Sequence, residues 1–305
     1  MVSFAWHSQH IYSLKLAFIT SYAPPILGGG MLIEHDIKTQ LCEFSQKLGL
    51  VTPQRNNKSN KIRKVEQIIA FLEVIHSQVR KYSHKRELVF VDSGAGNCYL
   101  SFIVYYYYHY VVQRPVRIHC IDINEALMNK NRDFAESIGF VQMHFHTADI
   151  EQYTHNGPID VAYSLHACDI ATDKAMLLGL RNNAKHILSV SCCQHSVKGK
   201  MQSYVSTRGL TKHSVIKDRL LYMVLDSMRA LLLEMRSYDV DVIEFVSTRA
   251  TDKNLMIRAH KKQLVNADAI FGQYKHLRSA YNLRPYLEGK LVELGLVSSF
   301  DQTSN

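Results

Sequence analysis

Cysteine is sparse in this chain, and its placement excludes a disulfide framework. The six cysteines form no CxxC pair, and no signal peptide precedes them. We therefore expect reduced thiols and a cytoplasmic protein. No stretch reaches the ~18 consecutive apolar residues of a membrane helix. The most apolar segment, residues 99–112, is shorter and is interpreted as a buried crossover helix. Internal repeats and low-complexity tracts are lacking as well.

Acidic residues are outnumbered by basic ones, which gives a formal net charge of +9. This excess favours a polyanionic partner such as RNA, although solvated lysines on an ordinary surface explain it equally. Apolar residues make up 47% of the 305, enough for a sizeable core and too many for a disordered chain. Basic residues gather within 55–64 and 198–219, and the second group could hold phosphates beside a reacting centre.

The apolar pattern divides the chain into four regions. Residues 1–30 are interpreted as a leader, disordered or absent from the mature protein, because prolines and three consecutive glycines precede Met31. Residues 31–86 predict a helical N-terminal segment, and residues 263–305 predict a helical tail. Between them, residues 87–262 alternate strands with helices, which predicts an α/β fold around a parallel sheet. The last two strands, 240–247 and 254–260, are too close for a crossover and must form an antiparallel hairpin.

Residues 88–101, LVFVDSGAGNCYLS, are the most informative run of the sequence. An apolar strand delivers Asp92 and a turn with Gly94 and Gly96 to the start of a helix, which builds a backbone cradle for a nucleotide-like ligand. The second strand ends at Asp122, 26 residues after Gly96, where a carboxylate can accept both hydroxyls of a ribose. Asp149 closes the third strand. Three acids after three strands point to a cofactor with a ribose, unless each acid only caps the following helix.

A nicotinamide cofactor competes for the same motif. Its fingerprint is GxGxxG, and here Tyr99 stands at the last position. This departure counts against a dehydrogenase.

Polar residues also gather where the fourth and fifth predicted strands end. Residues 164–176 read SLHACDIATDKAM, and residues 189–195 read SVSCCQH. Adjacent strand ends meet at one edge of a parallel sheet, so these side chains are expected near one spot, where polar groups are costly to bury unless they are used. The candidate bases are His166, Asp169 and His195, and Cys193 is a further catalytic candidate.

Four motifs together resemble a family of S-adenosylmethionine-dependent methyltransferase-like proteins. They are VDSGAGNCYLS, LHACDIATDKAM, SCCQH and EFVSTRATDKNLMI, within about residues 60–260. The LHxCxxATD and CCxH pair is also similar to the tRNA ribose 2′-O-methyltransferases that act on the acceptor stem. The resemblance implies the class I methyltransferase fold, a Rossmann-like seven-stranded sheet, with S-adenosyl-L-methionine as cofactor. The chain departs from the family at Ser191, where proline is usual, and at Cys98, where a smaller residue is usual.

For this cofactor, each acid has an expected partner. Asp92 would hold the amino group of the methionine moiety, Asp122 the ribose hydroxyls, and Asp149 the adenine amine. The full set of expected cofactor contacts is Asp92, Gly94, Gly96, Asp122, Ile123, Asp149, Ile150 and Leu165.

The cysteines after the fourth and fifth strands allow three interpretations. Cys168, Cys192 and Cys193 with His195 could form a zinc site, a cysteine could act as a nucleophile in pyrimidine C5 methylation, or the thiols could only pack beside the cofactor. Adjacent cysteines on a strand point in opposite directions, so four-way convergence is disfavoured and no metal is predicted.

The sequence as a whole predicts a methyltransferase that acts on RNA, either tRNA or rRNA, with no membrane association and no obligate protein partner. A protein or small-molecule methyltransferase of the same fold is one alternative. A non-catalytic module that binds S-adenosylmethionine or RNA is another.

Overall fold

A seven-stranded sheet forms the centre of the protein. The structure is a computed structural model that describes residues 32–50, 58–197, 199–201, 207–262 and 267–300. The strands are β1 (Leu88–Ser93), β2 (Val116–Asp122), β3 (Met143–Thr147), β4 (Val161–Ala167), β5 (His186–Ser191), β6 (Tyr238–Glu244) and β7 (Leu255–Lys261). Their order is β3-β2-β1-β4-β5-β7-β6. The first five are parallel, and β7 runs antiparallel to both β5 and β6. The predicted fold, a class I methyltransferase sheet with a terminal antiparallel hairpin, is confirmed.

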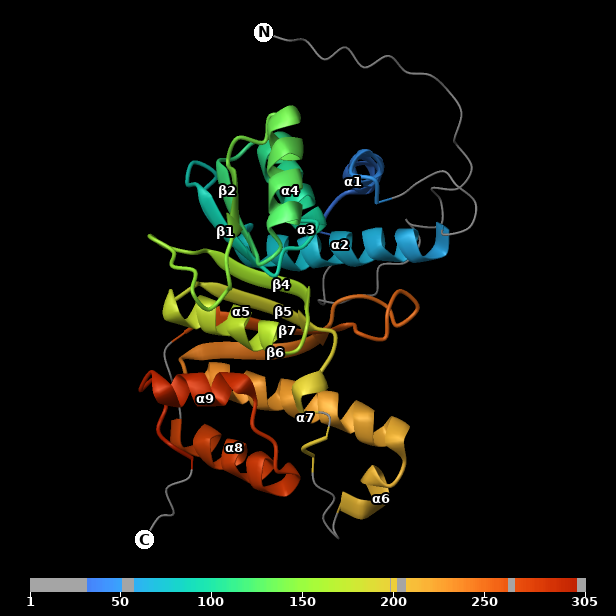
Figure 1. Cartoon of the computed structure of the whole chain (residues 1–305). Helices are drawn as coiled ribbons and strands as arrows, with labels where there is room; N and C mark the ends of the chain where they lie inside the picture. Colours follow the sequence, from blue (N-terminus) through green and yellow to red (C-terminus); the bar gives the residue numbers. More distant parts are fainter. Residues whose placement is uncertain (1–31, 51–57, 198, 202–206, 263–266, 301–305) are drawn as a thin grey trace.

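Helices cover both faces of the sheet (Figure 1). One face packs against α1 (His35–Lys47), α2 (Lys58–Val79), α3 (Tyr99–Tyr106) and α4 (Glu125–Ser137). The other packs against α5 (Ile170–Arg181), α7 (Ser214–Glu234), α8 (Ala267–Tyr281) and α9 (Tyr286–Glu293). A short helix, α6 (Arg208–Thr211), leads into α7. The two apolar faces thus bury two cores, one on each side of the strands.

The helical tail is part of the second core. Within the tail predicted for residues 263–305, the structure has two helices, α8 and α9, because Pro285 precedes α9 in an extended conformation that ends helical continuity. Leu283, Leu287 and Leu291 are fully buried among side chains of α5 and α7. The predicted leader, residues 1–30, lies outside the described residues.

The crossover after β1 differs from the single helix predicted for residues 99–112. After α3 the backbone widens into a π-helix over Tyr107–Val111. Both Tyr107 and Tyr108 are buried: Tyr107 packs edge-on against His76, and Tyr108 stacks on Phe90 with ring centroids 5.4 Å apart. We attribute the wider turn to the burial of two consecutive tyrosines on one side, which regular helical spacing does not allow.

No helix in the described ranges combines the length and the apolar character that a membrane span needs.

Candidate active site

The cofactor loop lies where the strand order reverses, between β1 and β4. Ligands of open α/β sheets bind at this crevice. Gly94 and Gly96 have φ values of +72° and +52°, a conformation that favours glycine. A Cβ at Gly94 would lie 3.4 Å from the Cβ of Ala167 on β4, whereas the space at Gly96 is open. The loop therefore has the close-approach geometry that the glycine motif predicts.

Cys98 adopts a left-handed conformation, with φ of +53°, at the start of α3. Its thiol is buried, and the side-chain amide of Asn131 on α4 donates to it at 3.1 Å and to the Gly96 carbonyl at 2.8 Å. Cys98 is thus held against α4.

Asp92 is a buried carboxylate at the end of β1. The Ser101 hydroxyl donates to its Oδ2 at 2.6 Å, which leaves the Tyr163 hydroxyl to donate to Ser101, also at 2.6 Å. Burial raises the pKa of Asp92 to about 7, while the Ser101 hydrogen bond lowers it and Asp122 raises it. A cationic ammonium group fits beside such a carboxylate because it would compensate the buried negative charge.

Asp122 connects the glycine loop to the end of β2. Its Oδ2 accepts from the Gly96 backbone N–H at 2.8 Å, and its Oδ1 accepts from the Asn124 N–H at 2.9 Å. Each oxygen keeps acceptor capacity, so both can still bind ribose hydroxyls. The neighbouring Ile123 is 74% exposed and offers apolar surface beside this site. These features fit the nucleoside part of S-adenosylmethionine.

Asp149, predicted to close the third strand, lies beyond the end of β3 at Thr147, and it already has a cationic partner. Lys174 on α5 contacts its two oxygens at 2.7 and 2.9 Å, and this hydrogen-bonded ammonium lowers the pKa of Asp149. Ile150 is buried beside it, and Leu165 on β4 is partly buried. The adenine contact of Asp149 stays a prediction, since the carboxylate also anchors α5.

His166 lies at an irregular point of β4. Its φ is +63°, and the pairing with β5 shifts register between Leu165 and Ala167. The imidazole Nε2 is 2.9 Å from Oε1 of Gln67 on α2, so Nε2 carries the proton and donates. Nδ1 is then an acceptor, buried and without a hydrogen bond to any described residue. Burial and Lys64 lower the pKa of His166, which favours the neutral ring.

Asp169 is held in an unusual backbone conformation, with φ of +54° and ψ of −117°, directly before α5. Non-glycine residues in sparsely populated regions concentrate at functional sites and cost about 1–3 kcal/mol each. The carboxylate accepts from the Ser196 backbone N–H at 2.8 Å and from its hydroxyl at 2.7 Å. Asp169 thereby joins the ends of β4 and β5. The side chain of His195, the third candidate base, lies outside the described residues.

The predicted fifth strand ends two residues early. β5 stops at Ser191, so Cys192 and Cys193 follow the strand instead of alternating across it. Cys168 comes from the end of β4, and its Sγ lies 3.1 Å from that of Cys192. Seven residues are expected together at this edge. The backbone carbonyl of His166 contacts the thiols of Cys168 and Cys192, whereas Gln194 contacts Arg229 on α7. The remaining expected residues are Asp169, Cys193 and His195, and Asp169 directly follows Cys168 while Cys193 directly follows Cys192.

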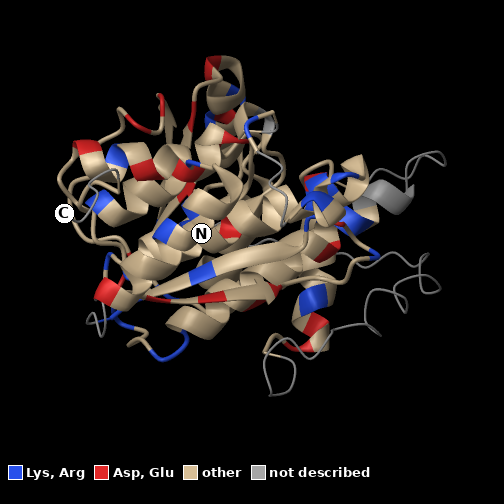
Figure 2. Ribbon diagram, turned by 90° about the horizontal axis from the view of Figure 1, so that it is seen from below, with Lys and Arg blue, Asp and Glu red and all other residues tan. Residues whose placement is uncertain are grey.

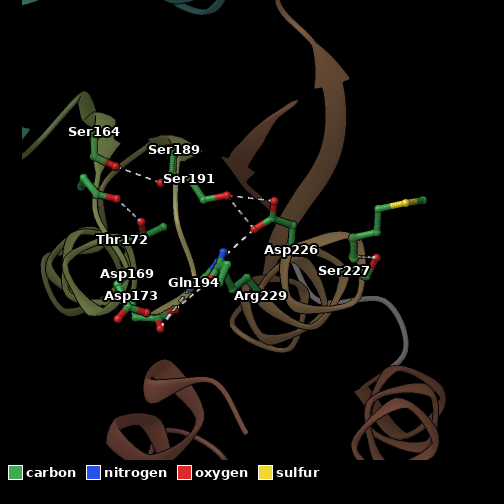
Figure 3. Close-up of polar contacts among 12 residues, drawn as sticks. Ser164, Asp169, Thr172, Asp173, Ser189, Ser191, Gln194, Asp226, Ser227 and Arg229 are labelled. Carbon is green, nitrogen blue, oxygen red and sulfur yellow. Dashed lines mark hydrogen bonds and ion pairs between the residues drawn. The ribbon is translucent and has the colours of Figure 1, made fainter. Parts of the chain in front are cut away.

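A buried ion-pair network supports this edge from below (Figure 3). Arg229 on α7 is 2% exposed and contacts Asp173 on α5 at 2.8 Å and Asp226 at 3.0 Å. It also donates to Oε1 of Gln194 at 3.1 Å. Ser191, which stands where proline is usual in the family that the sequence resembles, donates to Asp226 at 3.0 Å. The network fixes the loop after β5, so Ser191 supplies through a hydrogen bond part of the rigidity that proline would give.

Sequence reasoning missed the partners that position the site. Gln67 lies 99 residues before His166, and Arg229 lies 56 residues after Asp173, so no local pattern connects them. A signal was present for Arg229, because it falls on the apolar face of a predicted helix, where a lone charge needs a partner. Gln67 offered no such signal.

The comparisons with known proteins concern the same region. Residues 61–200 match the model of a family described as a methyltransferase domain. No curated protein matches the chain.

Several solved structures are similar. An rRNA methylase from Streptococcus thermophilus has 12% identity and a TM-score of 0.40, and the match covers 70% of this chain and 100% of that one. The 23S rRNA methyltransferase ErmE has 11% identity and a TM-score of 0.40, with 75% and 79% covered. The magnesium protoporphyrin IX methyltransferase from Synechocystis, solved with S-adenosylhomocysteine, has 14% identity and a TM-score of 0.44, with 74% and 99% covered. All three TM-scores are below 0.5, so the substrates of these proteins do not bear on the substrate of this chain.

When bound, S-adenosylmethionine supplies a methyl group on a positively charged sulfur, and the chain's own residues must align the acceptor and receive any proton it loses. The strand order, the fit of the glycine loop, Asp92 and Asp122 to this cofactor, and the match over residues 61–200 agree. The chain is an S-adenosylmethionine-dependent methyltransferase with the class I fold.

Proposed function

We propose that this methyltransferase acts on RNA, either tRNA or rRNA. The observation that carries the proposal is a rim of basic side chains around the edge where β4 and β5 end. Three segments supply it: the beginning of α2, the α6–α7 region, and the turn between β6 and β7. Its described members are Arg63, Lys64, Arg208, Lys212, Lys217, Arg219, Arg249 and Lys253. Figure 2 shows several such positions close together at one end of the molecule.

Contacts between the three segments support a position of the rim beside the edge where β4 and β5 end. Gln67 on α2 hydrogen-bonds His166 at the end of β4 and donates to the Ala250 carbonyl, at 3.4 Å, in the β6–β7 turn. Lys253 of the same turn lies 3.8 Å above the ring of Tyr222 on α7. Lysine and arginine side chains arranged in this way attract phosphates without reading sequence, and they position a nucleic acid for chemistry at a fixed point.

Within this rim, His166 is the group that we propose accepts a proton from the acceptor. Its Nδ1 has a lone pair with no partner among the described residues, and Gln67 fixes the ring by its other nitrogen. Because this Nδ1 is buried, the role requires that acceptor binding exposes it. Asp169 is less suited, because both of its oxygens bind Ser196. A general base contributes about 10²–10⁴-fold to a rate. His166→Ala should therefore reduce turnover strongly and change cofactor affinity little.

The proposal is tested by incubating the purified chain and tritiated S-adenosylmethionine with RNA and protein fractions from a deletion strain. We expect label in RNA. Lys212→Glu and Arg219→Glu should weaken RNA binding and each reduce the salt dependence by about one unit of log K per log salt. Lys85→Glu, an exposed reversal in the loop before β1 at the opposite end of the strands, is the matched control.

Label found only in protein would contradict the RNA proposal and favour a protein acceptor. If Lys212→Glu and Lys85→Glu weaken RNA binding equally, the basic rim does not bind the RNA. A cytoplasmic location, which the cysteine content predicts, belongs to the same proposal.

A further inference from the structure

Three thiols converge where β4 and β5 end, and neither cofactor binding nor proton transfer uses them. Cys168 precedes Asp169 at the start of α5, and Cys192 and Cys193 follow β5. The Sγ atoms of Cys168 and Cys192 are 3.1 Å apart, those of Cys192 and Cys193 are 3.9 Å apart, and all three lie within 4.8 Å of one another. Such convergence is unexpected for two adjacent cysteines on a strand. It occurs here because the strand ends at Ser191.

The spacing of the sulfurs suits a tetrahedral metal ion. Zinc–sulfur bonds of about 2.3 Å at tetrahedral angles place two sulfurs about 3.8 Å apart. The Cys192–Cys193 distance of 3.9 Å matches this value, and the two remaining distances require only a small side-chain adjustment. Cys168 is exposed and the other two are partly exposed, so an ion and a fourth ligand can reach the cluster from solvent.

The cluster also lies at the beginning of a helix. Cys168 directly precedes Asp169, the N-cap of α5. Helix N-termini stabilise thiolates, and a bound metal ion removes the protons of its thiol ligands outright.

We propose that Cys168, Cys192 and Cys193 bind a thiophilic divalent metal ion of the zinc class, with its fourth coordination position open toward the acceptor edge. Three S–H bonds break and three sulfur–metal bonds form, so one Zn²⁺ displaces three protons and no electrons are exchanged. Sites with three protein ligands and an open position are the catalytic type, in which water or a substrate atom completes the tetrahedron. The site can therefore orient an acceptor group next to His166. The inference does not depend on RNA being the substrate.

The test uses the full chain, reduced and freed of metal, titrated with Zn²⁺ against a chromophoric chelator and separately with Co²⁺. We expect one metal ion per chain, proton release on binding, and a thiolate-to-cobalt charge-transfer band. Cys168→Ser and Cys193→Ser should each weaken binding at least about 100-fold, because even outer partners of metal ligands are worth about 10–100-fold. Cys42→Ser, a buried thiol on α1, is the control and should bind as the wild type does.

Circular dichroism shows whether each variant folds, and Cys168, being exposed, is the position least able to disturb packing. Three results would overturn the metal site. The first is a wild type that takes up cobalt without the charge-transfer band. The second is equal affinity of the wild type and both folded site variants. The third is a mass two hydrogens short in the protein isolated without reductant, with peptide mapping that joins Cys168 to Cys192 in a disulfide. Each is independent of whether RNA is methylated.

Discussion

Binding of S-adenosylmethionine should depend on pH through Asp92. Burial raises the pKa of this carboxyl to about 7, so about half of it is ionised at pH 7, about a tenth at pH 6 and about a hundredth at pH 5. The amino group of the cofactor stays protonated throughout this range. If the ammonium requires the carboxylate, affinity falls about fivefold from pH 7 to pH 6 and about tenfold more by pH 5.

Isothermal titration calorimetry measures this dependence directly. In two buffers of different ionisation enthalpy at pH 7, binding should release about half a proton per cofactor. Asp92→Asn removes the titrating group while it keeps the side chain's shape, so its weaker binding should be nearly constant from pH 7 to pH 5. Wild-type affinity that does not change over this range, or equal proton release by the variant, would refute the reasoning.

The ionisation of Asp92 should also make the stability of the protein depend on pH. The folded-state pKa of Asp92 lies above the unfolded value, so its contribution is fully present below about pH 4 and is lost as the pH rises through about 7. Without cofactor, Asp92→Asn should therefore be more stable than the wild type at pH 8 and closer to it at pH 5, which urea unfolding at both pH values checks.

Three further changes address other parts of the structure. Arg229→Met leaves Asp173 and Asp226 buried without their cation, so urea unfolding should show a loss of about 3–5 kcal/mol, and a loss under about 1 kcal/mol would contradict the network. Burial and neighbouring histidines lower the pKa of His119 to about 3, so stability present above about pH 6.5 is lost as the pH falls. Because glutamine does not titrate, His119→Gln should reduce this loss in the free energy of unfolding by at most about 2 kcal/mol at pH 5. An acid-unfolding transition at the same pH in the variant and the wild type would contradict the prediction. Asp122→Asn should weaken S-adenosylmethionine binding about 10- to 100-fold by calorimetry, since hydrogen bonds to charged groups contribute about 1.5–3 kcal/mol, and unchanged affinity would remove Asp122 from the site.

Much of the sheet could be predicted because the information is local. The β1 run, the glycine turn and Asp122 each form a short pattern whose geometry follows from strand and loop chemistry. The short connection between the last two strands likewise leaves only an antiparallel hairpin. Parallel strands place their carboxyl ends at one edge, so the meeting of His166 and Asp169 with the cysteines followed from topology alone.

What could not be predicted depends on contacts between distant segments. His166 is hydrogen-bonded to Gln67, and Asp149 is hydrogen-bonded to Lys174 on α5. Each candidate site residue therefore also holds a neighbouring helix in place. β5 ends at Ser191, whose hydroxyl donates to Asp226 on α7, and strand propensity contains no information about that contact. That two-residue difference decides whether adjacent thiols diverge or converge.

A crystal structure with S-adenosylhomocysteine tests the central claim most directly. We predict that both ribose hydroxyls lie within hydrogen-bond distance of the Asp122 carboxylate, that the amino group contacts Asp92, and that the sulfur faces the edge containing His166 and Asp169. A nucleoside bound elsewhere, or a sulfur turned away from that edge, would contradict the account.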